Sequence, residues 1–206
     1  MNENTGQDYI LDTLKIVGLD RIKEIILKSE KERREYGFRF CKNDGIKVTS
    51  TCVGTECDLN LKHCKDGEQI IGSFHTHPTA IRDKVNFLSD EDIYAEVIDK
   101  SKFACLGLIE NNISKIKCYL HNYGVEKSLI DNRNNLKEQY GIKIREYNPS
   151  GRKGGARALP PEKYNELRKI YQRFLLADNR LKLEAGRSAL KLIKEPNQGS
   201  DLIINL

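Results

Sequence analysis

Two histidines and an aspartate have the residue types and spacing of metal ligands. His75 and His77 lie two apart in an apolar, β-prone segment, and Asp92 falls on the first turn of the helix predicted after it. Residues two apart in a strand point to the same side, so both imidazoles can reach one point in space. Two imidazoles and one carboxylate are a ligand set that Zn²⁺ accepts, with a fourth position left for water. We therefore predict one zinc ion per chain, bound by His75, His77 and Asp92.

A hydrolytic zinc site also needs a group that moves a proton. Zinc lowers the pKa of the water that it binds from about 15.7 to about 7, and a carboxylate outside the ligand set can serve as general base and then as acid. Glu35 immediately precedes a strand predicted to start at Tyr36, where a neighbouring strand edge could face the metal. Glu35 also falls in the charged run of residues 31–35, which fits a solvated helix face equally well, and Glu32 stays open as a substitute.

These segments resemble the JAMM or MPN-type metalloproteases, whose motif is an upstream Glu, then His-x-His-Pro, then Ser-x-x-Asp. The matching residues here are 35–37 (Glu-Tyr-Gly), 75–78 (His-Thr-His-Pro) and 89–92 (Ser-Asp-Glu-Asp). The resemblance covers roughly residues 20–120. It departs from the family in the longer separation of eleven residues between His77 and Ser89, which makes residues 79–87 a longer loop.

The resemblance implies a fold, a reaction and a substrate class. The fold would be an MPN-like (cytidine-deaminase-like) mixed β-sheet flanked by helices. Glu35 would be the catalytic base, and Ser89 would stabilise the oxyanion of the tetrahedral intermediate. The reaction would be hydrolysis of a peptide or isopeptide bond, at the C-terminus of a ubiquitin-like or sulfur-carrier protein. Ser-x-x-Asp is also the pattern of a helix capping box, and the two roles are compatible.

Hydrophobic periodicity predicts the elements that must position these residues. Helices are expected at 20–35, from Ser89, and at 125–140, and strands where the apolar pattern changes period. The Asp44-Gly45 pair is typical of a hairpin turn, and Ser89 of a helix N-cap. The predicted strands are 36–41, 46–53, 69–75, 103–109 and 113–120. This order describes an α/β domain with mixed strand directions and a C-terminal helical extension.

The charge distribution divides the chain. Residues 1–140 hold 21 Lys/Arg and 23 Asp/Glu, a net −2, whereas residues 141–206 hold 14 and 7, a net +7. We predict a metalloprotease domain at 8–140, a basic Gly-rich linker at 141–159 and a basic helical extension at 160–206. The extension could bind a protein partner or a nucleic acid. The alternative function is therefore an MPN-fold scaffold or a RadC-like protein that binds a complex or nucleic acid through this helix.

The cysteines leave several interpretations open. Cys52, Cys57 and Cys64 lead into the His75 strand without the paired Cys-x-x-Cys of structural zinc sites, so a second metal, a disulfide and free thiols are all compatible with them. The other three lie in apolar strands and are interpreted as small core residues: Cys41, Cys105 and Cys118.

Composition bears on the cellular setting. The chain is 38% hydrophobic, which is too apolar for wholesale disorder, and its apolar runs are far shorter than the ~18 residues of a membrane span. Residues 1–8 are polar and acidic, unlike a secretory signal. We therefore expect no membrane association and a cytoplasmic location.

Overall fold

The computed structural model describes residues 3–55, 59–79, 88–120, 125–147, 159–194 and 202–206. The chain divides into two compact units. One consists of Met1–Gly124 and Gly186–Leu206, and the other of Val125–Ala185. The first unit holds the sheet and the predicted metal ligands, and the second is helical.

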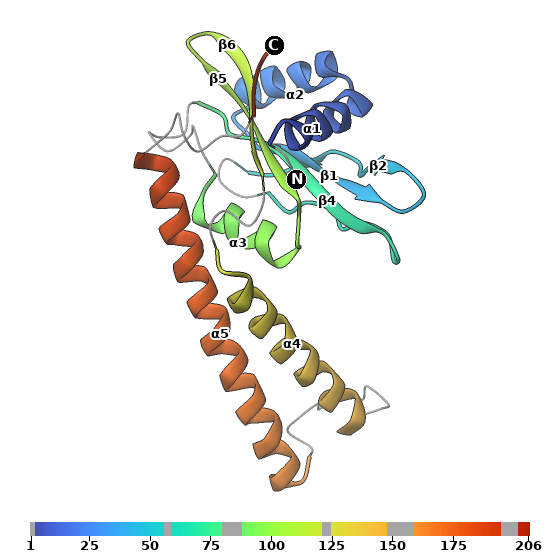
Figure 1. The fold of residues 1–206 in the computed structure, drawn as a ribbon, viewed down its shortest axis with the longest axis vertical. Coiled ribbons are helices and arrows are strands. Elements are labelled where there is room, and N and C mark those ends of the chain that lie inside the picture. Colours follow the sequence, from blue (N-terminus) through green and yellow to red (C-terminus); the bar gives the residue numbers. More distant parts are fainter. Residues whose placement is uncertain (1–2, 56–58, 80–87, 121–124, 148–158, 195–201) are drawn as a thin grey trace. The chain divides into compact units, whose positions relative to one another are not determined.

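The strands described in the first unit form one seven-stranded mixed sheet (Figure 1). Among the strand pairs described, β4 and β5 run parallel and the others antiparallel. The prediction of an α/β fold with a mixed sheet flanked by helices is therefore confirmed. The strand order is β2 (Ile46–Val48), β1 (Tyr36–Lys42), β4 (Gln69–Thr76), β5 (Phe103–Glu110), β6 (Ile113–Leu120), β7 (Leu202–Asn205), and β3 (Cys52–Val53) also pairs with β1.

Helices cover both faces of this sheet. Side chains alternate between the faces along each strand, so Phe74 and Thr76 of β4 face the layer of α1 (Glu3–Val17) and α2 (Leu19–Glu32), and Thr76 Oγ1 hydrogen-bonds Ser29 of α2. Ser73 and His75 face the other way, toward α3 (Asp90–Ile98). Parallel strands need a crossover connection, and α3 lies in the one between β4 and β5. The carboxyl end of β4 and the start of α3 are thereby brought together.

Four buried phenylalanines form the centre of the core between the sheet and the α1–α2 layer. The Phe38 ring lies 5.1 Å from that of Phe74 and 5.3 Å from that of Phe40, which in turn lies 5.6 Å from Phe103, centroid to centroid. All four are fully buried. Burial of each such side chain contributes about 1.5–3 kcal/mol, so the packing of β1, β4 and β5 that supports the site is strongly stabilised.

The N-terminal helices differ from the sequence prediction. The stretch before residue 18 is a helix of its own, and Gly18 separates it from α2 with a φ of 89° that favours glycine. The helix expected at 20–35 ends at Glu32, because Arg33 adopts the left-handed conformation (φ 53°). Glu35 therefore lies in the connection to β1 and not on a helix, which removes the interpretation of this residue as part of a solvated helix face.

The C-terminal third also differs. The helix expected at 125–140 is α4 (Lys127–Tyr147), so residues 141–147 are helical where a linker was predicted, and residues 148–158 lie outside the described part. The sequence did not predict strand β7, because a segment of four residues is too short to show a hydrophobic period. It pairs with β6 so that Ile204 lies opposite Ile116. The last residues of the predicted helical extension thus belong to the sheet.

The second unit is an antiparallel pair made by α4 and the greater part of α5 (Pro161–Lys194), whose proline start matches the prediction. Arg133 Nε donates to Asp178 Oδ1 at 2.9 Å, and the Tyr140 and Tyr171 rings lie 5.3 Å apart. Residues later in α4 contact residues earlier in α5, as an antiparallel pair requires. No helix among the described residues is long and apolar enough to cross a membrane.

The cysteine predictions need correction. Cys41, Cys105 and Cys118 are buried core residues, as predicted, but they are not free thiols. Cys41 is joined to Cys64, and Cys105 to Cys118. Cys105 and Cys118 are directly opposite in the β5–β6 register, and antiparallel pairing is what brings them together. Cys52 is free, and Cys57 lies outside the described residues.

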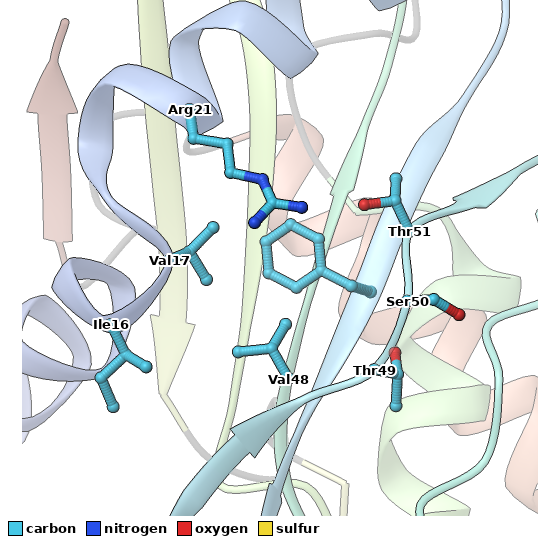
Figure 2. Close-up of a pocket in the computed structure, with 8 residues that line it drawn as sticks. Ile16, Val17, Arg21, Val48, Thr49, Ser50 and Thr51 are labelled. Carbon is cyan, nitrogen blue, oxygen red and sulfur yellow. The ribbon is translucent and has the colours of Figure 1, made fainter.

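A pocket of about 280 Å³ lies on the α1–α2 face of the sheet (Figure 2). Its lining includes the apolar residues Phe38 and Val48 and the polar residues Arg21 and Thr51. None of its eight lining residues is His, Cys, Asp or Glu. The pocket therefore lacks the groups for metal binding or acid–base chemistry, which lie on the opposite face of the sheet.

Candidate metal centre

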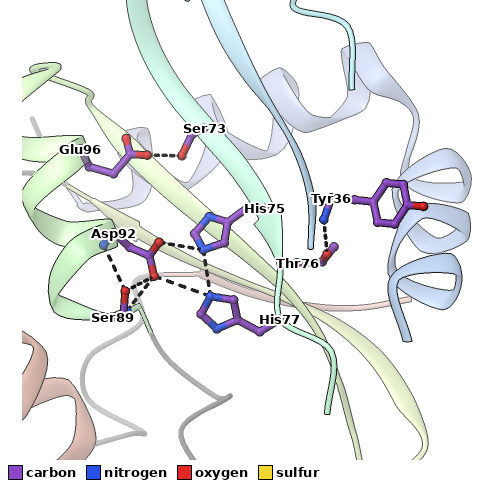
Figure 3. Close-up of polar contacts among 8 residues, drawn as sticks. All are labelled: Tyr36, Ser73, His75, Thr76, His77, Ser89, Asp92 and Glu96. Carbon is purple, nitrogen blue, oxygen red and sulfur yellow. Dashed lines mark hydrogen bonds and ion pairs between the residues drawn. The ribbon is translucent and has the colours of Figure 1, made fainter. Parts of the chain in front are cut away.

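His75 and His77 present their imidazoles to one another at the end of β4 (Figure 3). Their Nε2 atoms are 3.1 Å apart. The backbone N–H of His77 donates to the carbonyl of Gly107 on β5 at 3.0 Å, which holds the chain against the sheet just beyond the last residue of β4. His75 is buried and His77 half-buried. The pair is therefore held by backbone structure on both sides and is shielded from bulk water.

Asp92 approaches the two histidines from the first turn of α3. Its Oδ1 lies 3.4 Å from His75 Nε2, and its Oδ2 lies 3.6 Å from His77 Nε2. Ser89 is the N-cap of α3 and forms a reciprocal capping box with Asp92. In that box the Ser89 backbone N–H donates to Asp92 Oδ2 at 2.8 Å. The cap therefore orients the carboxylate, with Oδ1 directed at His75.

The donor groups of the three residues lie at separations close to those of a tetrahedral zinc site. Ligand atoms at about 2.0–2.1 Å from a tetrahedral ion lie about 3.3 Å from one another. Here the two Nε2 atoms are 3.1 Å apart, Asp92 Oδ1 lies 3.4 Å from that of His75, and the other carboxylate oxygen, Oδ2, lies 3.6 Å from that of His77. One ligand atom from each of His75, His77 and Asp92 can thus contact a single ion, and the group could hold a metal. The sequence named these three residues as ligands, and the fold brings them together.

The electrostatics of the group favour a cation. Burial alone would lower the pKa of His75, but the charge and hydrogen bond of Asp92, with the charges of Glu35 and Glu96, raise it to about 9. Burial would raise the pKa of Asp92, but His75 and His77 hold it well below its usual range. Without metal, a proton on His75 therefore supplies the positive charge that this cluster attracts.

Glu35 lies on the same face of the sheet as the histidines. Gly37 is opposite His75 in the β1–β4 pairing, and continuing that register by two residues places Glu35 opposite His77. The strands are still adjacent there, because Tyr36 N–H donates to Thr76 Oγ1 at 2.9 Å. Opposite residues in an antiparallel pair share a face, and the charge of Glu35 raises the pKa of His75.

The backbone of Glu35 is fixed on its other side by the segment after β3. Its N–H donates to the Thr55 carbonyl and its own carbonyl accepts from the Gly54 N–H, both at 2.9 Å. Next to it, a Cβ on Gly37 would lie 2.6 Å from the Phe74 carbonyl oxygen and 2.7 Å from Leu59 Cδ2. Glycine is needed here because residues 59–61 pack directly onto β1 beside Glu35.

Glu32, the alternative base, is directed elsewhere. It accepts a hydrogen bond from the Tyr36 hydroxyl and lies 3.9 Å from Lys28 Nζ. Tyr36 alternates with Glu35 and Gly37 along the chain, so its side chain is on the α1–α2 face. The placement therefore favours Glu35 over Glu32 as the carboxylate near the histidines.

Ser89 has a structural role that the motif alone did not separate from a catalytic one. Its Oγ donates to Asp92 Oδ2 at 2.7 Å and accepts from the Asp92 N–H at 3.1 Å. To bind an oxyanion, this hydroxyl would have to redirect its one proton from Asp92. The loop of residues 79–87 predicted between the two motif halves lies, from residue 80, outside the described part.

A second carboxylate beneath the site escaped the sequence analysis. Glu96 is buried on α3 and accepts a hydrogen bond from Ser73 Oγ on β4, and burial raises its pKa. A signal for it was present, because Glu96 lies four residues after Asp92 and Ser73 two before His75. These spacings put each residue on the same face of its element as the neighbouring ligand. The charge of Glu96 also contributes to the raised pKa of His75.

The fold and this group of side chains define a mixed α/β protein with a candidate site for a divalent cation. No protein-family model matches the chain, and no curated protein matches its sequence. The donor geometry and the short motifs are therefore the observations from which a function can be inferred.

Proposed function

We propose that this protein is a zinc-dependent peptidase or isopeptidase with an MPN-like fold. The observation that carries the proposal is the convergence of His75, His77 and Asp92 at zinc-like separations, on the face of the sheet that also bears Glu35. An isolated His-Asp cluster would serve a structural metal equally well. The nearby carboxylate, which the ligand geometry does not use, favours a hydrolytic role.

A zinc ion bound by these residues would polarise a carbonyl group and acidify water. The chain's own residues would do the rest. Glu35 takes a proton from the attacking water and returns it to the leaving amine. Asp92 would be a ligand of the ion together with the two histidines, and the Ser89 cap orients its carboxylate. Ser89 is proposed to donate to the developing oxyanion once its hydroxyl turns from Asp92.

The proposed substrate is the C-terminus of a ubiquitin-like or sulfur-carrier protein, joined by a peptide or isopeptide bond. This part of the proposal follows from the motif resemblance and from no contact in the structure. We propose zinc as the metal because two imidazoles and one carboxylate with an open fourth position are typical of catalytic zinc.

The test combines metal analysis with hydrolysis. Full-length protein loaded with zinc is incubated with a panel of ubiquitin-like proteins fused to a C-terminal peptide, and with isopeptide-linked conjugates. We expect cleavage by the wild type, none by Glu35→Gln at unchanged zinc content, and cleavage by the matched control Glu32→Gln. Loss of zinc in Glu35→Gln would contradict the role of Glu35 as a base outside the ligand set. Zinc binding without cleavage of any substrate would refute the peptidase assignment.

A binding role for the second unit is the other candidate, and one observation favours it. On α5, Lys169, Arg173 and Arg180 share an exposed face with Leu176 and Leu183, which are 72% and 67% exposed. No acidic residue interrupts this spacing of three and four. If the face binds nucleic acid, Arg173→Glu/Arg180→Glu in the full chain should abolish a salt-dependent shift of DNA or RNA. If the wild type and the variant shift the nucleic acid equally, and added salt does not weaken the shift, nucleic-acid binding by this face is excluded.

A further inference from the structure

A second group of potential ligands lies away from the histidines. Cys41 is at the end of β1, and Cys64 and Glu68 flank the turn that leads into β4. One ligand atom from each of the three lies within 4.8 Å of the others. The turn is closed by the Glu68 N–H, which donates to the Lys65 carbonyl at 3.0 Å. It therefore presents Cys64 and Glu68 together, four residues apart.

Glu68 is unusually enclosed for a glutamate in a surface turn. Its side chain is 8% exposed. Lys65 N–H donates to Oε2 at 3.1 Å, and Lys47 Nζ donates to Oε1 at 3.2 Å. These bonds fix the carboxylate next to the two sulfur atoms, and each oxygen keeps a lone pair for a further contact. The carboxylate is thus oriented in advance, as the ligands of a metal site are.

We propose that Cys41, Cys64 and Glu68 form a second metal site, for zinc or a similarly thiophilic divalent cation, when the Cys41–Cys64 disulfide is reduced. A dithiol reductant transfers two electrons and two protons to the disulfide and becomes a disulfide itself. The cation then displaces the two thiol protons, which pass to solvent. Water completes the coordination.

The charges and ligand types suit such an ion. Two thiolates and one carboxylate around a divalent cation leave a net charge of −1, which the Lys47 ammonium beside Glu68 balances. Thiolate ligands select zinc over magnesium or calcium. Tetrahedral zinc holds two thiolate sulfurs about 3.8 Å apart, so these atoms need to separate by about 2 Å from their bonded distance.

The site would hold the same part of the chain that the disulfide holds. Cys64 ends the segment of residues 59–64, whose Leu59 and Leu61 contact the position of Gly37 on β1, two residues from Glu35. A disulfide is unstable in a reducing compartment. A metal bound by the same two cysteines would keep this segment against β1 under reducing conditions, so that Glu35 stays supported in either redox state.

The test is metal stoichiometry of the full-length protein, independent of any hydrolysis. Metal-free protein, either oxidised or reduced with a metal-inert phosphine, is equilibrated with zinc, desalted and analysed by mass spectrometry. We expect about one zinc in the oxidised and about two in the reduced protein, the first from the histidine group. Cobalt(II) should give a thiolate charge-transfer band only after reduction.

Variants identify the ligands. Glu68→Gln and Cys64→Ser should each lose one zinc from the reduced protein, whereas the matched control Cys52→Ser should keep both. His75→Ala should lose the other zinc and keep the cobalt–thiolate band, which separates this proposal from the histidine site. Equal zinc content in oxidised and reduced wild type would overturn the proposal. So would loss of the reduction-dependent zinc in Cys52→Ser with its retention in Glu68→Gln.

Discussion

Zinc binding to the histidine group at pH 7 must displace a proton from His75. The pKa of His75 in the zinc-free protein is about 9. A group with a pKa of about 9 is about 99% protonated at pH 7. Asp92 is already ionised, because its pKa is held well below the usual range. Each zinc that binds at pH 7 should therefore release about one proton from His75.

This proton sets the pH dependence of zinc affinity. Two units between pH 7 and the pKa correspond to an apparent affinity about 100-fold, or roughly 3 kcal/mol, weaker than that of the deprotonated site. The affinity should therefore rise about tenfold per pH unit above pH 7 and level off above about pH 9. Calorimetry in buffers of different ionisation enthalpy measures the released proton. Competition with a chromophoric chelator measures the affinity at each pH.

A matched variant tests the cause of the effect. Asp92 makes the largest contribution that raises the pKa of His75. Asp92→Asn should therefore release fewer protons per zinc at pH 7, and because it also removes a ligand it should bind zinc more weakly at every pH. Wild-type protein that released no proton at pH 7, with an affinity constant between pH 7 and 8.5, would refute the reasoning. His75 would then be neutral before zinc binds.

Further predictions concern stability. Folding raises the pKa of His75 from 6.5 to about 9. In the zinc-free protein, protonated His75 should therefore contribute fully to the free energy of unfolding below pH 6.5, and this contribution should be lost as the pH rises through 9. Urea titrations that show stability rising over this range would contradict the prediction. Gly37→Ala should destabilise by about 1–3 kcal/mol because the Cβ meets backbone, whereas Gly45→Ala, with open space around it, should be nearly neutral in urea. Ser89→Ala should cost about 1 kcal/mol and lower zinc affinity, since the cap orients a ligand; unchanged zinc affinity would separate the two roles. Asp178→Asn should cost roughly 3 kcal/mol because it removes the negative charge that faces the buried Arg133 guanidinium, and zinc affinity should not change.

The parts of the site that were readable from sequence depend on short-range rules. His75 and His77 are two apart in a strand, and side-chain alternation alone puts both on one face. Ser89 and Asp92 match a capping box, which predicts both the start of α3 and the orientation of the carboxylate. Each of these inferences needs only a few neighbouring residues, which is why one sequence was enough to name the three candidate ligands.

Other features depend on which distant segments pair. The β1–β4 register, continued by two residues beyond its last pair, puts Glu35 opposite His77, some forty residues away. Strand pairing likewise joins Cys105 to Cys118 and adds β7 to the sheet. Such pairings are selected by the burial of apolar side chains over the whole core, and any one segment contributes only a small part of that burial. The pattern of residues therefore predicted the ligands. The neighbours of Glu35 and the bonding partners of the cysteines depend on strand pairing, which only the tertiary structure shows.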